Sequence, residues 1–168
     1  MAKNFKTHVS GQIGEHLVVA ELGRLGIVAT TFSGNLPDVD ILAYANGKSI
    51  PIQVKAQKNG TPGLDAKKYL DIHIEGHLQT VSGKVDDIDR DLVFVLVKIA
   101  EKLGEDRFYI FRQGVIQDLV YKEYSQFLKK HDGVRPRNPN TTHCSYYLKD
   151  LSQYEDNWRL ITDPLGMS

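Results

Sequence analysis

The most informative part of this sequence is residues 37–56, Pro37-Asp-Val-Asp-Ile-Leu-Ala-Tyr-Ala-Asn-Gly-Lys-Ser-Ile-Pro-Ile-Gln-Val-Lys-Ala56. Two runs rich in apolar and β-branched residues lie on either side of an Asn-Gly pair. The two central residues of the tightest hairpin turn both need positive φ, which Asn and Gly adopt most readily. The stretch therefore predicts two antiparallel strands, over 38–45 and 48–57, joined at Asn46-Gly47.

The turn also predicts which side chains face one another. With Asn46-Gly47 at the centre of the turn, Asp40 lies opposite Gln53 and Asp38 lies opposite Lys55. Because side chains two residues apart share one face of a strand, all four polar side chains project from the same side. The other face carries the apolar residues expected in the core: Val39, Ile41, Ile50, Ile52 and Val54.

These polar residues have the chemistry of a magnesium site. Carboxylate and amide oxygens, here from Asp40 and Gln53, are ligands of the kind that Mg²⁺ takes, and the carbonyl of Val54 is a further candidate. A lysine beside such an ion, here Lys55, orients an attacking water and stabilises charge that develops on a phosphate. A solvated polar face of the sheet explains the spacing about equally well, so spacing alone leaves both readings open.

The order Pro37-Asp-Val-Asp40, Asn46-Gly47, Ile52-Gln-Val-Lys55 resembles the signature of the PD-(D/E)XK phosphodiesterase superfamily. The hairpin is especially similar to that of archaeal Holliday-junction resolvases, including an upstream Ser-Gly pair, here Ser33-Gly34. The family also carries a glutamate on its first core helix, and Glu15 stands where that residue is expected. The resemblance covers about residues 8 to 57.

The resemblance implies an α/β fold: a restriction-endonuclease-like core with a mixed β-sheet flanked by helices. It implies that Asp40 is the metal-binding acid, that Gln53 fills the second acidic position, and that Lys55 is the catalytic lysine. Glu15 and the Val54 carbonyl complete the expected metal site, for Mg²⁺ with Mn²⁺ as a substitute. Gln53 replaces the usual Asp or Glu, and a neutral ligand weakens the affinity for a metal. DNA is the implied partner, and the family is often homodimeric.

The remaining sequence predicts an α/β domain with a mixed sheet. Ser10 is expected to cap a helix that runs to about Leu25 and ends at Gly26. Further expected elements are a strand over 27–32, a strand over 69–75 followed by an irregular or helical stretch, a buried strand over 92–99, its hairpin partner over 107–112, a helix over 115–130, a loop over 133–142, and a short strand and helix around Trp158. We expect a single domain over 1–168, with family-specific elaboration over 58–168.

The charge balance argues against a protein that coats nucleic acid through bulk electrostatics. Lys plus Arg and Asp plus Glu are 21 each, so the net charge is zero with neutral histidines. A local basic groove remains compatible with that balance. Ser33, Lys58, Arg135 and Arg137 are the candidate nucleic-acid contacts. For the two arginines, a surface loop without a function is about equally favoured.

The expected function is that of a metal-dependent endonuclease that hydrolyses DNA phosphodiester bonds. The single cysteine, Cys144, excludes an internal disulfide, and the longest apolar run, over 92–97, is too short to cross a membrane. We therefore expect a cytoplasmic protein. One rival is a catalytically degenerate nucleic-acid-binding or assembly module on the same fold, and another is an antitoxin- or immunity-like interaction protein. Lys55 favours the enzyme, because a degenerate site has no need of a lysine facing two aspartates.

Overall fold

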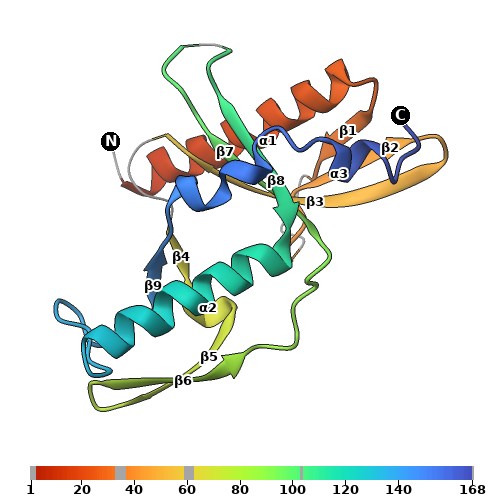
Figure 1. Ribbon diagram of the computed structural model, residues 1–168. Coiled ribbons are helices and arrows are strands. Elements are labelled where there is room, and N and C mark those ends of the chain that lie inside the picture. Colours follow the sequence, from red (N-terminus) through yellow and green to blue (C-terminus); the bar gives the residue numbers. More distant parts are fainter. Residues whose placement is uncertain (1–2, 33–36, 59–62, 103, 168) are drawn as a thin grey trace. The chain divides into compact units, whose positions relative to one another are not determined.

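The computed structural model describes residues 3–32, 37–58, 63–102 and 104–167 (Figure 1). Its elements are α1 (Lys3–Arg24), β1 (Val28–Thr31), β2 (Ile41–Ala45), β3 (Lys48–Gln57), β4 (Gly63–Asp65), η1 (Ala66–Lys68), β5 (Leu70–Glu75), β6 (Leu78–Lys84), β7 (Val93–Lys98), β8 (Arg107–Arg112), α2 (Gln113–Lys130), β9 (His143–Ser145), η2 (Leu148–Tyr154) and α3 (Arg159–Thr162).

These elements form two compact units. The first consists of Met1–Gly60, Leu92–Arg112 and Leu151–Ser168, and the second of Thr61–Asp91 and Gln113–Asp150. The chain therefore passes between the units several times. The single domain expected from the sequence stays a prediction.

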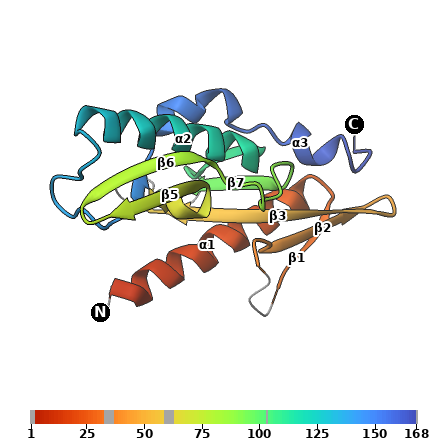
Figure 2. The same cartoon turned by 90° about the horizontal axis from the view of Figure 1, so that it is seen from below.

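The first unit is built on a five-stranded sheet with the order β1-β2-β3-β7-β8. β3 and β7 are parallel, and the other neighbouring strands are antiparallel. Helix α1 runs along one side of β1, β2 and β3 (Figure 2). The predicted α/β fold with a mixed, helix-flanked sheet is confirmed.

The predicted hairpin between β2 and β3 is confirmed with its register. Asn46 and Gly47 have φ values of 52° and 76°, as the tight turn requires. Ala45 pairs with Lys48, and the ladder continues without a shift to the pair of Ile41 and Ile52. The strand predicted over 38–45 begins at Ile41, however, because Asp38 lies in a turn with φ 63°. Asp38 is therefore no strand residue facing Lys55.

The core of the first unit lies between the sheet and its helices. Val18 and Leu22 of α1 are fully buried together with Ile52, Val95 and Ile161. All five residues of β7 from Val93 to Val97 are buried. This confirms the prediction from the continuous apolar run, which is typical of a strand covered on both faces.

Helix α1 is longer than the sequence predicted. It begins at Lys3, so Ser10 lies inside the helix instead of capping it. No glycine or proline stands between Lys3 and Ser10, so the backbone continues in helical conformation ahead of the expected cap. The predicted end is correct, because Gly26 adopts φ 77° just after the helix.

The second unit contains helix α2 and two short antiparallel pairs, β5 with β6 and β4 with β9. The stretch after β5 forms strand β6, so the expectation of an irregular or helical segment there is wrong. Gly76, with φ 60°, makes the turn between the two strands. The sequence of β6 does not show the apolar alternation of a strand, because its one buried position holds the polar residue Gln79.

The predicted helix over 115–130 is confirmed as α2, which starts two residues earlier. Ile116, Val120, Tyr124 and Leu128 form the buried face of this helix. Phe127, which the helical spacing of the apolar residues would place on the inward side, keeps 37% of its surface exposed. Among the residues that the structure describes, no helix is both long and apolar enough to pass through a bilayer.

Candidate functional site

Asp40 lies directly before β2, where the ladder between β2 and β3 becomes irregular. Its N–H donates to the carbonyl of Ile52 over 2.9 Å, whereas its own carbonyl accepts from the N–H of Phe32 over 3.2 Å. In a regular strand the N–H and C=O of one residue point to the same neighbouring strand. The two groups of Asp40 reach opposite neighbours, so strict alternation of side chains ends at Ile41, as at a β-bulge.

The carboxylate of Asp40 is fixed against β3. Its Oδ2 atom accepts a hydrogen bond of 2.7 Å from the N–H of Val54. The ladder with β2 ends at Ile52, so Val54 has no partner residue in β2 and the carboxylate takes the place of a backbone acceptor. Asp40 is thereby held beside the backbone that connects Gln53 to Lys55. The predicted facing of the Asp40 and Gln53 side chains stays a prediction.

Glu15 on α1 lies close enough to Asp40 for their charges to interact. Burial raises the pKa of Glu15, and the negative charge of Asp40 raises it further, while His16 and His8 act in the opposite direction. The side chain is partly buried, as expected at the boundary between helix and sheet. Two carboxylates whose charges interact in this way repel each other, and a cation bound by both would relieve that repulsion.

Close packing of α1 on β3 determines where Glu15 stands. A β-carbon on the neighbouring Gly14 would overlap the β-carbon of Ala56 and touch Val54. Only glycine therefore permits this approach of helix to strand. Gly14 thus has a packing role, whereas a β-carbon on Gly11 would meet nothing within 4 Å.

Gln53 carries an unsatisfied polar atom. Its Oε1 atom is buried and has no hydrogen-bond partner among the described residues. Burying an acceptor without a partner costs about 1–3 kcal/mol, so such an atom calls for an explanation. Lys55, two residues along β3 on the same face, is exposed.

The donor set fits a hard divalent cation. It offers two carboxylates, from Glu15 and Asp40, and the buried Gln53 oxygen without a partner, with the Val54 carbonyl nearby. Over the described part of the chain no cluster of three or more His, Cys, Asp or Glu side chains is arranged for a metal. A site of this composition therefore depends on the amide oxygen of Gln53.

The candidate nucleic-acid contacts are distributed over both units. Ser33 lies outside the described residues. Lys58 is exposed at the end of β3, where its carbonyl accepts from Lys98 Nζ over 2.7 Å. Arg135 and Arg137 belong to the second unit, in the loop that follows α2.

The neighbours of Arg135 were not evident from the sequence. Its guanidinium lies over the rings of Phe127 and Tyr124, at 4.8 Å and 5.3 Å from the ring centroids, and it donates to the carbonyl of His143 over 2.9 Å. The helical pattern placed both rings in the core. Phe127 lies three residues before Lys130, and its exposure identifies it as a surface aromatic residue. The contact with Arg135 depends on the course of the loop after α2, which brings the guanidinium over the Phe127 ring.

Comparisons with known proteins identify no family for this chain. No protein-family model matches the chain. No curated protein matches it either. Among solved structures, the chain is similar to a bacterial homing endonuclease, I-Ssp6803I, with a TM-score of 0.49, 16% sequence identity and 94% of each chain covered.

Proposed function

We propose that this protein is a metal-dependent endonuclease that hydrolyses DNA phosphodiester bonds. The observation that carries the proposal is the buried Oε1 of Gln53, which has no hydrogen-bond partner in the described part of the chain and lies on the strand whose next residue binds Asp40. A bound Mg²⁺, or Mn²⁺ in its place, would give this oxygen a partner. DNA as the substrate comes from the resemblance of residues 8 to 57 to the PD-(D/E)XK superfamily.

Glu15, Asp40, Gln53 and the Val54 carbonyl would hold the ion. When bound, such an ion polarises a phosphate and makes water a better nucleophile at neutral pH. Lys55 has two tasks in the reaction. It orients the attacking water and offsets the negative charge that grows on the phosphate oxygens. Water then adds to phosphorus as the bond to the leaving oxygen breaks, and the resemblance implies that the product keeps a 5′-phosphate.

The hydrogen bond from Val54 to Asp40 orients the carboxylate before any metal arrives. Since one oxygen of Asp40 is engaged by the backbone, the group is fixed in place and loses little conformational entropy on binding an ion. The raised pKa of Glu15 means that its proton must leave before it acts as a ligand. Metal affinity is therefore expected to rise with pH through the titration of Glu15.

The test is cleavage of duplex, junction and single-stranded DNA with Mg²⁺ or Mn²⁺ by wild type and Lys55→Ala. We expect the variant to lose cleavage by at least about a hundredfold, because one preorganised stabilising group is worth that much in comparable sites. Its melting temperature is expected to stay unchanged, since Lys55 is exposed. Lys48→Ala is the matched control, an exposed lysine at the start of the same strand.

Gln53→Glu tests whether Gln53 is a metal ligand or only a buried amide. If Gln53 binds the ion, the added charge should raise the affinity for Mg²⁺ or Mn²⁺ in a calorimetric titration. If Gln53 does not face the ion, affinity stays the same and the metal site is refuted. A wild-type protein that binds neither ion at millimolar concentration would instead be the degenerate binding module.

A further inference from the structure

Two pockets in the second unit share one wall. The first, of about 370 Å³, lies between the carboxyl-terminal half of α2 and β9. The second, of about 660 Å³, is lined by the end of α2 and the loop that follows it. Phe127, Arg135 and His143 line both pockets. All lining residues belong to the second unit, so the site is complete within it.

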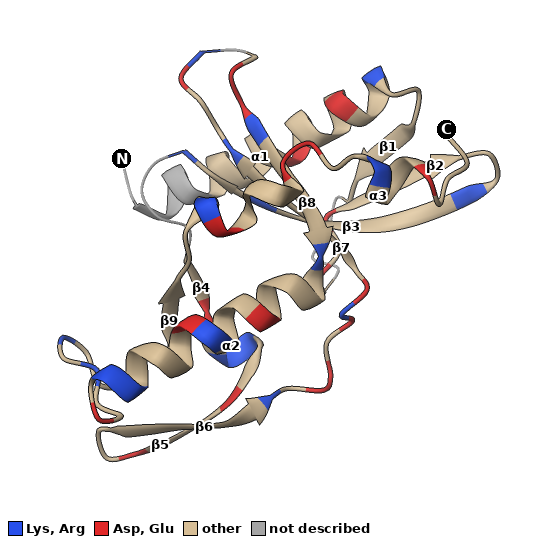
Figure 3. Ribbon diagram, in the orientation of Figure 1, with Lys and Arg blue, Asp and Glu red and all other residues tan. Residues whose placement is uncertain are grey.

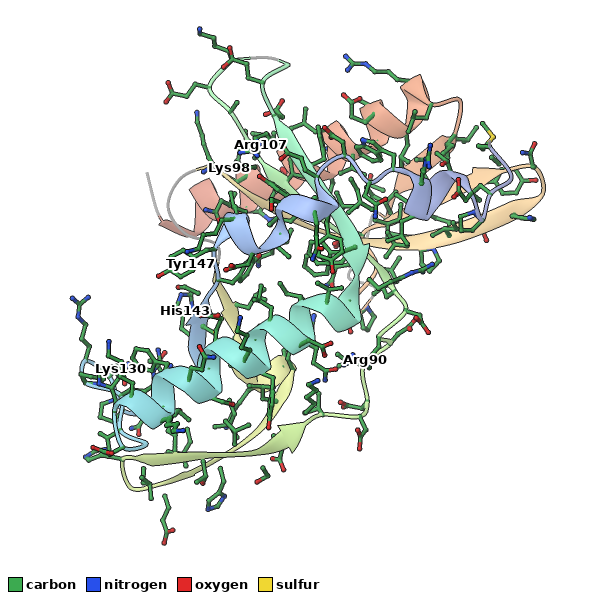
Figure 4. All side chains as sticks on the ribbon, viewed as in Figure 1. Arg90, Lys98, Arg107, Lys130, His143 and Tyr147 are labelled. Atoms are coloured by element: carbon green, nitrogen blue, oxygen red, sulfur yellow. The ribbon has the colours of Figure 1, made fainter. Side chains whose placement is uncertain are left out.

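The first pocket presents aromatic rings to its interior. Phe127 is 37% exposed and Tyr147 is 55% exposed. In Figure 4, His143 lies on β9 and Tyr147 just beyond it, while Lys130 extends from the end of α2. Exposed aromatic side chains around a cavity are typical of a binding surface.

The position of the His143 ring depends on a glycine. A β-carbon on Gly63, in the neighbouring strand β4, would overlap the imidazole of His143. The ring therefore lies directly against the backbone of Gly63. This contact limits how far the imidazole can turn and keeps it as a fixed part of the wall.

The charge of the wall is positive. Lys130, Arg135 and Arg137 contribute three fixed cations, and Glu123 is the one carboxylate among the lining residues. In the part of the chain that the structure describes, none of these three cations forms an ion pair. Figure 3 shows Lys and Arg gathered at the end of α2 and in the following loop.

Arg135 is preorganised for an anion. It is stacked on Phe127 and Tyr124, and one of its nitrogen atoms, Nη2, donates to the His143 carbonyl. A guanidinium has five N–H donors, so this bond leaves others for a ligand. Arginine held in this way binds phosphate with charge-assisted hydrogen bonds and with little further loss of freedom.

The two adjoining pockets together form one surface, the aromatic–cationic pocket. We infer that it binds an unpaired nucleotide of a nucleic-acid strand. Phe127, His143 and Tyr147 offer rings on which a base can stack, and Lys130, Arg135 and Arg137 offer cations to the adjoining phosphates. Bases inside a duplex are stacked on one another and cannot enter, so the pocket selects an unpaired one. This binding needs no metal and no cleavage at Asp40.

The test is fluorescence anisotropy of the full chain with a short labelled oligothymidylate in the presence of EDTA. Phe127→Ala is expected to weaken binding by roughly tenfold, as the loss of a stacking ring does elsewhere, and Phe127→Trp to restore it. Arg135→Ala should weaken binding and lower the slope of log affinity against log salt by about 0.7, the value of one phosphate contact in single strands.

Two residues of α2 outside the pocket serve as matched controls. Tyr121, 40% exposed, matches Phe127, and the exposed Lys122 matches the pocket cations. We expect Tyr121→Ala and Lys122→Ala to bind like wild type. If they lose as much affinity as the pocket variants, the pocket is not the binding site and the inference fails.

Two further ligands distinguish a nucleotide site from a general anion surface. An abasic oligonucleotide of equal length should bind more weakly than oligothymidylate. Poly-glutamate should displace bound oligothymidylate poorly. Equal binding of the abasic strand, or ready displacement by poly-glutamate, would overturn the inference in favour of an acidic-peptide or simple anion surface. Lys55→Ala is expected to keep this binding, so its loss of cleavage would be a separate result.

Discussion

Glu15 is a carboxylate whose surroundings work against its ionised form. Burial is the larger cause of its raised pKa, and the charge of Asp40 is the second. A carboxyl group with a raised pKa in the folded protein keeps its proton to higher pH there than in the unfolded chain. The free energy of unfolding therefore falls as pH rises from the ordinary value of 4.5 to the raised one, and the loss persists above that window.

Glu15→Gln should consequently stabilise the metal-free protein at neutral pH. The amide removes the ionisation that the fold disfavours, so the melting temperature should rise above that of wild type in EDTA, and the gain should vanish below pH 4.5. Thermal unfolding followed by circular dichroism checks both pH values. Glu21→Gln on the same helix is the control; it removes an ion pair with Arg24 of 2.6 Å and should give no such gain. A gain that is independent of pH would contradict the argument.

Two of the three glycines of helix α1, Gly11 and Gly14, have different surroundings in the structure. Gly14 packs on Ala56 of β3, whereas a β-carbon on Gly11 meets nothing. Glycine inside a helix costs roughly 0.5–1 kcal/mol relative to alanine because of its greater backbone freedom in the unfolded chain. The close approach that Gly14 permits brings α1 onto β3 and holds Glu15 where the charge of Asp40 acts on it.

Gly14→Ala and Gly11→Ala should therefore shift the free energy of unfolding in opposite directions. The first forces helix and strand apart, at a cost of about 1–3 kcal/mol that exceeds the gain in helix propensity. The second gives only the gain, up to about 1 kcal/mol. Urea unfolding measures both, and Ala56→Gly should restore part of the loss in Gly14→Ala. Equal effects of the two alanines would show that α1 does not pack through Gly14.

In the second unit, one buried side chain connects segments that are far apart in the chain. The amide nitrogen of Gln79 donates to the carbonyls of Pro139 and Thr141, and its oxygen accepts from the hydroxyl of Tyr124. Strand β6, helix α2 and the loop over 133–142 are thus joined through a residue that is 2% exposed. The same loop carries Arg135, so this network also maintains the aromatic–cationic pocket.

Gln79→Leu should loosen the second unit while the sheet of the first keeps its order. Leucine removes the acceptor of the buried Tyr124 hydroxyl and the donor to two partly buried carbonyls, and the loss of a partner costs about 1–3 kcal/mol where the group is buried. Hydrogen exchange should accelerate in β6 and in the loop over 133–142, and stay slow in β7, because every contact of Gln79 named here lies in the second unit. Equal acceleration in β7 would mean that the two units unfold as one.

Local sequence determined the hairpin that carries the site. The turn at Asn46-Gly47 depends on backbone preferences of two adjacent residues, so it is readable without the rest of the chain. The register down to Ile41 follows from that turn, and the buried strand β7 follows from its unbroken apolar run. The resemblance then directed attention to Glu15, Asp40, Gln53 and Lys55.

Only the tertiary structure decided how these residues are supported. The backbone of Asp40 bonds both to Phe32, the residue after β1, and to Ile52 of β3, a condition that no pattern within one strand reveals. The pKa of Glu15 depends on burial between helix and sheet, and the exposure of Phe127 depends on a loop that returns to α2. Spacing along the chain specifies neighbours in one element, whereas burial and charge interactions arise from contacts between elements distant in sequence.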